Sequence, residues 1–216
     1  MSLEYDYIIA GGGSAGCVLA SRLANKSKDS ICLVEAGGSG KNLFIKMPAG
    51  NGFIFGNPKF DWGYHSVKQA QLNNRKIYFA RGKGLGGTSI VNGMVYIRGV
   101  AQDYDNWRQM GLDGWGYSDL LPYFKYSEGS TNRQNKFHGN QGPLKVEPAR
   151  NFSVIDEAFI KAAVETGHEF LDDFNANKRA GVSRIDSTTY RGVRQSSAIS
   201  YLKKVPKNLK IFTNTR

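Results

Sequence analysis

The chain has 216 residues and carries 29 Lys or Arg against 18 Asp or Glu, a formal charge of +11. Its basic residues are scattered, with one modest cluster in 203–210, and no nucleic-acid-binding motif accompanies them, so we predict no nucleic-acid partner. No apolar run reaches the ~18 residues of a membrane span, and no stretch resembles a secretory signal. Two cysteines without C-x-x-C spacing favour a reducing compartment and exclude a disulfide scaffold.

The first predicted elements form a β-α-β unit. An apolar run at Tyr7–Ala10 predicts a buried parallel strand, and the alanine-rich segment Cys17–Ala24 predicts a helix after it. A second buried strand is expected at Ile31–Val34. The thiol of Cys17 stands near the start of the helix, where a thiol can be acidified, but we expect it to pack the helix on the sheet.

The loop between the first strand and the helix fits G-x-G-x-x-G. In a dinucleotide site, Gly11 would permit the tight turn, Gly13 would let the backbone approach a pyrophosphate, and Gly16 would let the helix pack closely. The helix N-terminus offers free N–H groups and a partial positive charge. Glu35, 19 residues after Gly16, stands where an acidic side chain accepts hydrogen bonds from the adenosine ribose. We predict a dinucleotide site, with an ordinary glycine-rich turn as the alternative.

Residues 41–80 form an irregular, aromatic stretch. Its aromatic residues are Phe53, Phe55, Phe60, Trp62, Tyr64, Tyr78 and Phe79. We expect these side chains to pack in the core beside the ligand, and a substrate cage is the alternative.

A second glycine-rich segment spans residues 81–99. Its closely spaced glycines are Gly82, Gly84, Gly86 and Gly87. Such a segment, with short polar side chains among the glycines, can wrap a planar or phosphorylated ligand with main-chain N–H groups. By composition it could also be a flexible linker, but the apolar residues embedded in it argue against that alternative.

The next region, 101–127, predicts two short helices. Asp103 and Asp105 resemble a paired-carboxylate site, but their spacing points them to different helix faces, so we expect surface or capping roles. Residues 128–150 are polar and turn-rich and are predicted to form a linker.

The clearest helix is predicted at 153–166. Ser153 and Asp156 give it a capping-box start, and Gly167 ends it. Its apolar face contains Ile155, Phe159 and Ala162. Another helix is expected at Arg194–Leu202.

The alternation in Asn208–Thr213 predicts a final strand, after which only Asn214–Arg216 remain. A domain rarely stops on a strand that lacks a partner or cap. We therefore expect an N-terminal part of a longer enzyme, or one product of a split gene.

The segment Gly82–Asp105 resembles the first signature of the glucose–methanol–choline (GMC) flavoprotein oxidoreductases. Residues 5–37 resemble the usual N-terminus of that family. Further similar stretches are Gly114–Phe124, His138–Leu144 and Arg194–Ala198. The resemblance covers the chain from end to end, and within the family it is strongest to the choline dehydrogenase and aliphatic-alcohol dehydrogenase group.

The resemblance implies that the ligand is FAD, with its adenine half on the first glycine loop and its isoalloxazine ring near the second. The implied FAD-binding residues are Gly11, Gly13, Ser14, Ala15, Gly16, Glu35, Ala36, Arg81, Gly86, Gly87, Thr88, Asn92, Gly93, Met94 and Val95. The FAD would be held without a covalent bond, because Val91 stands where some relatives carry a flavin-linking histidine. The residues by themselves do not choose FAD over NAD.

No catalytic residue is predicted in this chain, because the resemblance implies that the family's catalytic histidine lies in sequence that is missing here. No metal site is predicted either, since the cysteines have neither C-x-x-C spacing nor a nearby histidine. None of His65, His138 and His168 matches it by motif. We expect a structural role for each, with His138 in a turn and the imidazole of His168 capping the preceding helix.

The expected fold is α/β: a Rossmann-like FAD-binding domain with the start of a substrate-binding α+β domain, truncated. The predicted parts are a FAD-binding domain (1–127), the beginning of a substrate or cap domain (128–190) and a return to the FAD-binding domain (191–216).

The predicted function is the FAD-binding portion of a GMC-type oxidoreductase acting on CH–OH groups, inactive alone. Its partners would be a small-molecule alcohol in the complete enzyme, a quinone or other electron acceptor, and a complementary C-terminal polypeptide. The alternatives are a non-catalytic nucleotide-binding subunit or fragment, and an alcohol oxidase using oxygen. The expected location is the cytoplasm or the periphery of the inner membrane, whose anionic surface would attract a basic face.

Overall fold

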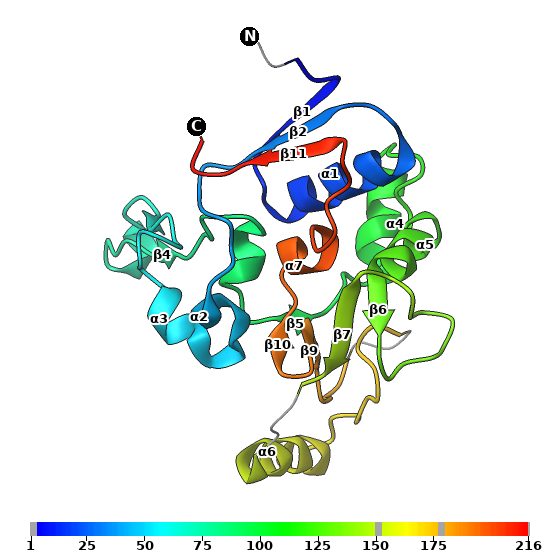
Figure 1. Cartoon of the computed structure of the whole chain (residues 1–216). Helices are drawn as coiled ribbons and strands as arrows, with labels where there is room; N and C mark the ends of the chain where they lie inside the picture. The colour runs from blue at the N-terminus through cyan, green and yellow to red at the C-terminus, as the bar shows by residue number, and fades with distance from the viewer. Residues whose placement is uncertain (1–3, 150–152, 177–179, 216) are drawn as a thin grey trace. The chain divides into compact units, whose positions relative to one another are not determined.

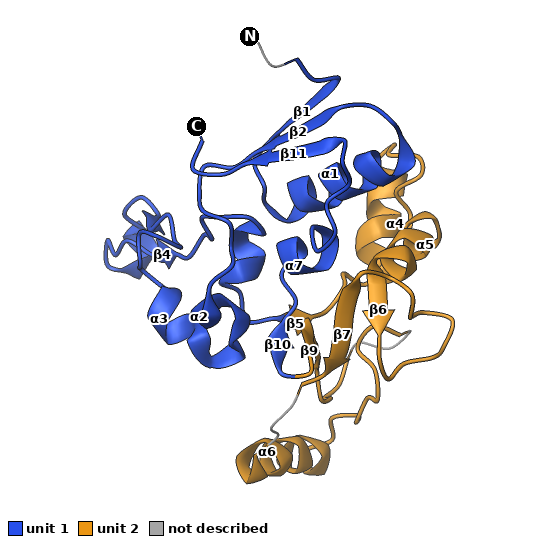
Figure 2. Cartoon of the chain, viewed as in Figure 1, with its two compact units in different colours: residues 1–94, 192–216 blue, residues 95–191 orange. Residues whose placement is uncertain are grey.

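The computed structural model describes residues 4–149, 153–176 and 180–215 (Figure 1). The chain forms two compact units, residues 1–94 with 192–216 and residues 95–191 (Figure 2). The predicted domain boundary after residue 127 therefore falls inside the second unit, whereas the predicted return at 191 lies next to the observed change of unit. The functional assignment of the parts stays a prediction.

The first unit is built on a parallel sheet with strand order β1-β2-β11. Its strands are β1 (Tyr7–Ala10), β2 (Ile31–Val34) and β11 (Leu209–Phe212). Tyr7 and Leu209 both pair with Ile31, so β2 is the central strand. Helix α1 (Ser14–Lys26) connects β1 to β2, as the sequence predicted. Its buried face packs on the sheet in a cluster of Ile9, Ala20, Ala24, Ile31, Leu33, Leu85 and Leu209.

The prediction that β1 is a buried strand is wrong. Only Ile9 is buried, whereas Tyr7 and Ile8 are 47% and 68% exposed. The reason is topological, because β1 lies at the edge of the described sheet and α1 covers one of its faces.

Short elements fill the rest of the first unit. They are α2 (Leu43–Lys46), η1 (Pro48–Gly50), α3 (Asn51–Ile54), β3 (Tyr64–His65), η2 (Ala70–Leu72), β4 (Tyr78–Phe79), η3 (Gly87–Ile90), β10 (Val193–Arg194) and α7 (Ser197–Tyr201). A second apolar cluster of Ile45, Ile54, Ile90 and Val91 joins three of them. Core packing was predicted for the aromatic residues of 41–80, but this is wrong for Phe53, Phe55, Tyr64, Tyr78 and Phe79, which are 38–60% exposed.

The second unit contains a four-stranded sheet in the order β5-β8-β7-β6. Its strands are β5 (Val95–Tyr96), β8 (Asp186–Ser187), β7 (Leu144–Pro148) and β6 (Glu128–Ser130). The unit also contains α4 (Ala101–Gln109), α5 (Tyr117–Ser127), α6 (Val154–Glu165) and β9 (Thr189–Tyr190). The predicted pair of helices in 101–127 is confirmed. Asp103 accepts the Val100 N–H at the start of α4, and Asp105 accepts the Tyr117 N–H, as expected for capping residues.

The predicted linker at 128–150 is wrong, because β6 and β7 occupy this stretch and pair in parallel. Glu128 and Val146 are completely buried. The polar composition misled the prediction, since the polar groups here bind one another inside the unit. Residue 150 lies outside the described residues, as does Arg216 at the end of the chain.

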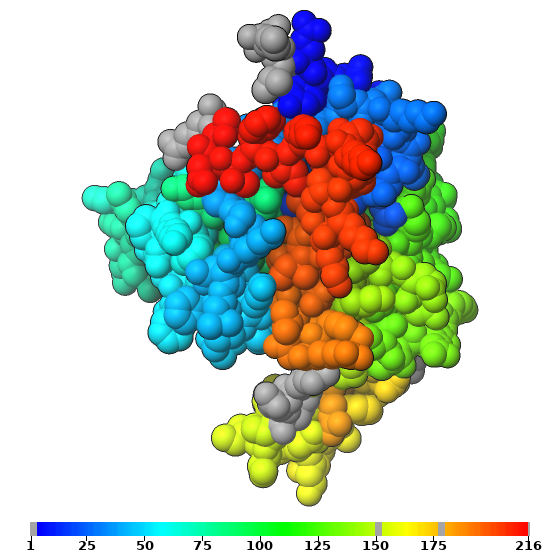
Figure 3. All heavy atoms as spheres, in the orientation of Figure 1, coloured from blue at the N-terminus to red at the C-terminus, as the bar shows by residue number. Residues whose placement is uncertain are grey.

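Helix α6 is confirmed together with both of its predicted ends. The Asp156 N–H donates to Oγ of Ser153, and the Ser153 N–H donates to Oδ2 of Asp156, which is the predicted capping box. At the other end Gly167 has a φ of +93°, and the His168 N–H donates to the Ala163 carbonyl. The C-terminal hydrogen bond thus comes from the backbone of His168 and not from its imidazole, which corrects the predicted cap. No residue of α6 is buried, and its atoms, coloured yellow, are visible on the surface in the space-filling view (Figure 3).

The helix predicted at Arg194–Leu202 begins later than expected. Arg194 lies in β10, and α7 starts at Ser197. The Ile199 N–H donates to Oγ of Ser196, so a serine cap fixes the start of the helix.

Candidate functional site

The first glycine loop connects β1 to α1 and has the shape that its three glycines predict. Gly11 has a φ of +95°, a conformation that side-chain-bearing residues rarely adopt. A Cβ on Gly16 would lie 2.0 Å from the Gly11 carbonyl oxygen, so only glycine lets the helix come this close. A Cβ on Gly13 would meet nothing within 4 Å. The space beside Gly13 is therefore open. The fold itself requires glycine at Gly11, for its positive φ, and at Gly16, for the close approach of the helix.

The N-terminus of α1 follows this loop directly. Gly13 is the N-cap residue, and no side chain caps the helix there. Ser14 and Ala15 form the first turn and are exposed, and no acidic side chain occupies that turn. The partial positive charge of the helix end is thus available to an anion.

Glu35, which follows β2, is hydrogen-bonded to the first glycine loop. Its Oε2 accepts the Gly12 N–H and its Oε1 accepts the Gly37 N–H, both at 2.7 Å. Glu35 as a whole residue is 7% exposed. Each carboxylate oxygen has a second lone pair, so Glu35 retains acceptor capacity beyond these two bonds.

The second glycine loop contacts the first one closely. The Gly86 N–H donates to the Gly12 carbonyl at 2.8 Å. Gly86 and Gly87 have φ values of +101° and +52°, and a Cβ on Gly87 would lie 2.7 Å from Cα of Gly13. Two segments more than seventy residues apart in sequence thus form one glycine-lined surface within the first unit.

Cys17 packs beside this surface. It is completely buried, and its Sγ donates to the Gly12 carbonyl at 3.1 Å. Burial is the main cause that raises the pKa of the Cys17 thiol to about 11. Its complete burial on the sheet-facing side of α1 confirms the expected packing role.

The remaining residues implied by the resemblance lie at several places. Thr88 belongs to η3, and Asn92, Gly93 and Met94 follow it. Arg81 is exposed and donates to the neighbouring Ala80 carbonyl. Val95 begins β5 in the second unit.

Ala36 lines a cleft of about 450 Å³ in the first unit, next to the end of β2. The cleft is lined by Ala36, Gly37, Gly38, Ser39, Gly40, Lys41, Asn42, Ile45, Lys59, Phe60, Lys83 and Asn214. Because a parallel sheet binds ligands beyond the carboxyl ends of its strands, this cleft lies where such a fold holds a ligand.

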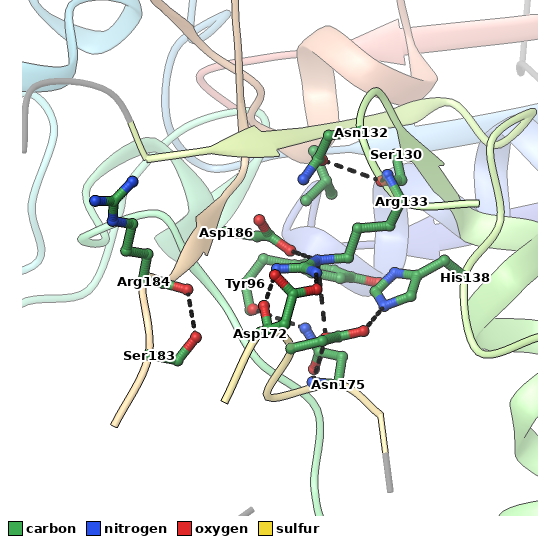
Figure 4. Close-up of polar contacts among 12 residues, drawn as sticks. Tyr96, Ser130, Asn132, Arg133, His138, Asp172, Asn175, Ser183, Arg184 and Asp186 are labelled. Atoms are coloured by element: carbon green, nitrogen blue, oxygen red, sulfur yellow. Dashed lines mark hydrogen bonds and ion pairs between the residues drawn. The ribbon is translucent and has the colours of Figure 1, made fainter. Parts of the chain in front are cut away.

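The second unit contains a buried polar network that no local sequence pattern predicts (Figure 4). His138 lies between two carboxylates, with Nδ1 2.7 Å from Oε1 of Glu128 and Nε2 2.9 Å from Oδ2 of Asp173. The guanidinium of Arg98 binds the other oxygen of Glu128 at 2.6 Å. Beside them, Arg133 binds Asp186 at 2.6 Å. Each ring nitrogen of His138 already has a carboxylate partner, so this histidine is structural, as predicted.

Metal binding and membrane crossing each require a particular arrangement of residues. Within residues 4–149, 153–176 and 180–215, no group of three or more His, Cys, Asp or Glu side chains is arranged to hold a metal ion. In the same residues no helix is both long enough and apolar enough to cross a membrane.

Comparison with known sequences adds a family match. A family model described as GMC oxidoreductase matches residues 5–216. The oxygen-dependent choline dehydrogenase of Sinorhizobium fredii is 43% identical over 201 residues, which are 93% of this chain and 37% of that protein. The oxygen-dependent choline dehydrogenase of Vibrio vulnificus is 39% identical over 209 residues, again 37% of its length. The chain thus spans well under half the length of these curated relatives.

Comparison with solved structures gives the same family of folds. The pyridoxine 4-oxidase from Mesorbium loti superposes with a TM-score of 0.92 at 34% identity, over 98% of this chain and 42% of that one. A FAD-dependent oxidoreductase from Chaetomium thermophilum superposes with a TM-score of 0.88 at 30% identity, over 97% and 38%. The predicted α/β fold class is confirmed.

Proposed function

Because the chain belongs to the GMC oxidoreductase family, whose members are FAD flavoproteins, we propose that it is the FAD-binding portion of an enzyme that oxidises the CH–OH group of choline or another small alcohol. The observation that carries the proposal is the meeting of the two glycine loops at the uncapped N-terminus of α1. The partial coverage of the relatives supports a role as one part of that enzyme.

The first unit fits a dinucleotide in three respects. The side of Gly13 is open, so a pyrophosphate can approach the backbone. The end of α1 offers N–H groups and a partial positive charge to that anion. Glu35 has acceptor capacity left for the ribose hydroxyls.

Each group of residues has a binding task in this proposal. Gly11–Gly16 and Glu35 hold the adenine half, and the segments 86–88 and 92–95 contact the isoalloxazine ring. FAD, when bound, accepts a hydride from the alcohol carbon. The share of this chain is to bind and orient the flavin and to exclude water from it.

The test compares two glycines of the same loop. Gly13→Val adds a side chain where the chain leaves space, so we expect only the small fall in melting temperature that an apolar N-cap causes, together with a loss of FAD binding in a fluorescence titration. Gly16→Ala is the contrast, because its Cβ meets the Gly11 carbonyl and should lower the melting temperature. A Gly13→Val variant that binds FAD as the wild type does would sink the assignment.

We further propose that the flavin is held non-covalently. Val91, where some relatives carry a histidine, is apolar and 1% exposed, so it offers no nucleophile to the flavin. After acid precipitation the yellow colour should stay in the supernatant. Flavin absorbance in the washed pellet would contradict this prediction.

The chain alone should turn over no alcohol, even with flavin bound. Proton abstraction needs a base within hydrogen-bond reach and commonly contributes ~10²–10⁴-fold to the rate. His138 is held by Glu128 and Asp173, and neither His65 nor His168 matches the family's catalytic histidine by motif. Stopped-flow mixing with choline under anaerobic conditions checks this, and flavin bleaching at an enzyme's rate would overturn it.

Partners and location complete the proposal. A quinone or similar compound would take the electrons, and a complementary C-terminal polypeptide would supply the catalytic histidine. Copurification of such a polypeptide would favour this reading over the alternative, a non-catalytic nucleotide-binding subunit. Production of hydrogen peroxide by the complete enzyme would identify an oxidase instead. A location in the cytoplasm or at the inner membrane is part of the proposal, and cell fractionation tests it.

A further inference from the structure

Arg194, in β10, is completely buried, and its guanidinium joins three separate segments of the first unit. Its Nε donates to the Ile45 carbonyl at 2.9 Å, one residue before the end of α2. Its Nη2 donates to Oδ1 of Asn51 at 2.6 Å, at the start of α3. Its Nη1 donates to the carbonyl and to Oδ1 of Asn92, at 2.7 and 2.9 Å. A single side chain thus holds α2, α3 and the second glycine loop together.

The acceptors of this guanidinium are carbonyl and amide oxygens, which carry no charge. Burial lowers the pKa of Arg194 to about 10, so the group is still a cation at neutral pH. A buried cation without a counter-charge opposes folding unless its hydrogen bonds offset the desolvation. The fork of five N–H donors suits this task, because it can bind several acceptors in fixed directions at once.

Asn92 receives the largest share of these bonds, and it shapes the end of the loop. Its Oδ1 also accepts the Met94 N–H at 3.3 Å. Met94 has a φ of +63°, a left-handed conformation that non-glycine residues rarely adopt. The turn through Gly93 is therefore strained, and the surroundings must over-determine it for it to persist. The guanidinium of Arg194 contributes to that constraint through its two bonds to Asn92.

A neighbouring bond from the same returning segment acts on the other end of the loop. The Ser197 N–H donates to Oγ of Ser89 at 2.9 Å, and Ser89 in turn donates to the Gly86 carbonyl at 2.5 Å. Residues 194–197 thus contact the segment 86–94 at two places, Ser89 and Asn92. Arg194 donates to both, to the Ser89 carbonyl at 3.4 Å and to Asn92 at 2.7 and 2.9 Å.

We propose that Arg194 is a positioning residue for flavin: by holding Asn92, it fixes the segment 86–94 in the shape that receives the isoalloxazine ring. This inference rests on the proposed function, since it takes the ring to bind at that segment. Arg194 itself is completely buried, and it acts through Asn92 and through the Ser89 carbonyl, to which its Nη1 donates at 3.4 Å.

The experiment uses the chain as it exists, with three variants. Arg194→Gln removes the charge and most of the donors, and Arg194→Lys keeps the charge but loses the fork. Arg133→Gln is the matched control, because it removes a mostly covered guanidinium, 11% exposed, from the second unit, where it binds Asp186. FAD affinity is measured by fluorescence titration, and the ordering of the loop by hydrogen exchange of the amides in 89–94 without FAD.

We expect Arg194→Gln to weaken FAD binding roughly 10- to 100-fold, the range that the loss of hydrogen bonds to a charged group produces. Exchange in 89–94 should accelerate by a similar factor while the amides of α1 stay protected. Arg194→Lys should lie between Arg194→Gln and the wild type in both measurements. Arg133→Gln should lower the melting temperature and leave FAD affinity unchanged.

Three results would overturn the inference: unchanged exchange in 89–94 for Arg194→Gln, unchanged FAD affinity for that variant, or equal loss of affinity in Arg133→Gln. If the wild type binds no FAD, the proposed function fails. The exchange comparison still decides whether Arg194 orders the loop, so the two failures are distinguishable.

Discussion

At the scale of single residues, the two carboxylates beside His138 shift its pKa strongly. Burial acts to lower the pKa of this imidazole, but the hydrogen bonds to Asp173 and Glu128 outweigh it and raise the pKa to about 9. The same contact acts on the partner. Burial raises the pKa of Asp173, yet its hydrogen bonds to His138 and to the Asn175 N–H bring it down to about 2. The histidine is therefore charged in the folded chain at neutral pH.

This charge predicts how stability depends on pH. The folded-state pKa of His138 lies above its ordinary value of 6.5, so its contribution is complete below pH 6.5 and is lost as the pH rises through about 9. We expect the free energy of unfolding to fall across that window by on the order of 2–3 kcal/mol. Urea unfolding at a series of pH values measures it. The variant His138→Gln should be less stable at pH 6.5 and should lack this fall. A wild-type chain with the same free energy of unfolding at pH 6.5 and above pH 9 would contradict the prediction.

The sequence predicted the first glycine loop and missed this network for one physical reason. The demands on Gly11, Gly16 and Glu35 come from neighbours within a single β-α-β unit, so their spacing reveals them. The partners of His138 stand 10 and 35 residues away, and only the folded sheet brings them together. The dipeptide His138-Gly139 predicted a turn, but no sequence pattern near it predicted the buried carboxylates of Glu128 and Asp173.

At the scale of elements, the stability of α6 depends on the hydrogen bonds that cap its two ends. None of its residues is buried, so packing contributes little and the helix must be stabilised by local bonds. The capping box at Ser153 and the left-handed Gly167 supply them. Its sequence predicted both ends, because caps are local patterns. The linker predicted at 128–150 shows the opposite case, since the pairing of β6 with β7 depends on residues in 186–187 that complete the sheet.

We predict that Ser153→Ala destabilises α6 by about 1 kcal/mol, the usual effect of losing an N-cap. Hydrogen exchange should accelerate in the first turns of α6 and not in α1. Lys161→Gln is the control on the same helix. It removes an exposed pair with Glu165 at 3.7 Å, and such pairs contribute little. Equal effects of the two variants would refute the role assigned to the cap.

At the scale of the whole molecule, apolar surface is the notable property. Val154, Ile155 and Phe159 are 86%, 79% and 70% exposed, and they lie together on α6. Phe212 in β11 is 37% exposed. The predicted apolar face of α6 thus has no cover within the part of the chain that the structure describes. Contiguous surface of this kind favours association.

We therefore expect the chain to bind a hydrophobic dye and to self-associate at micromolar concentration. A double variant, Ile155→Glu with Phe159→Lys, should reduce both, and its spacing of four residues adds a helix-stabilising ion pair. Val67→Lys is the control, because Val67 is as exposed as Ile155 but lies outside α6. Analytical ultracentrifugation and dye fluorescence give the readouts. A wild type that stays monomeric and binds no dye would contradict the prediction.

The place of β11 also has a consequence for how the chain acquires its fold during synthesis. The side chain of Asn208 binds the Ser27 carbonyl from 181 residues away, and Leu209 pairs with Ile31. A ribosome releases β2 long before it releases β11. During synthesis, therefore, the edge of β2 that later pairs with β11 stays unpaired. Closing so long a loop is slow, and the waiting edge can pair with other chains. Chaperone capture of nascent chains should therefore persist until residues 209–212 emerge.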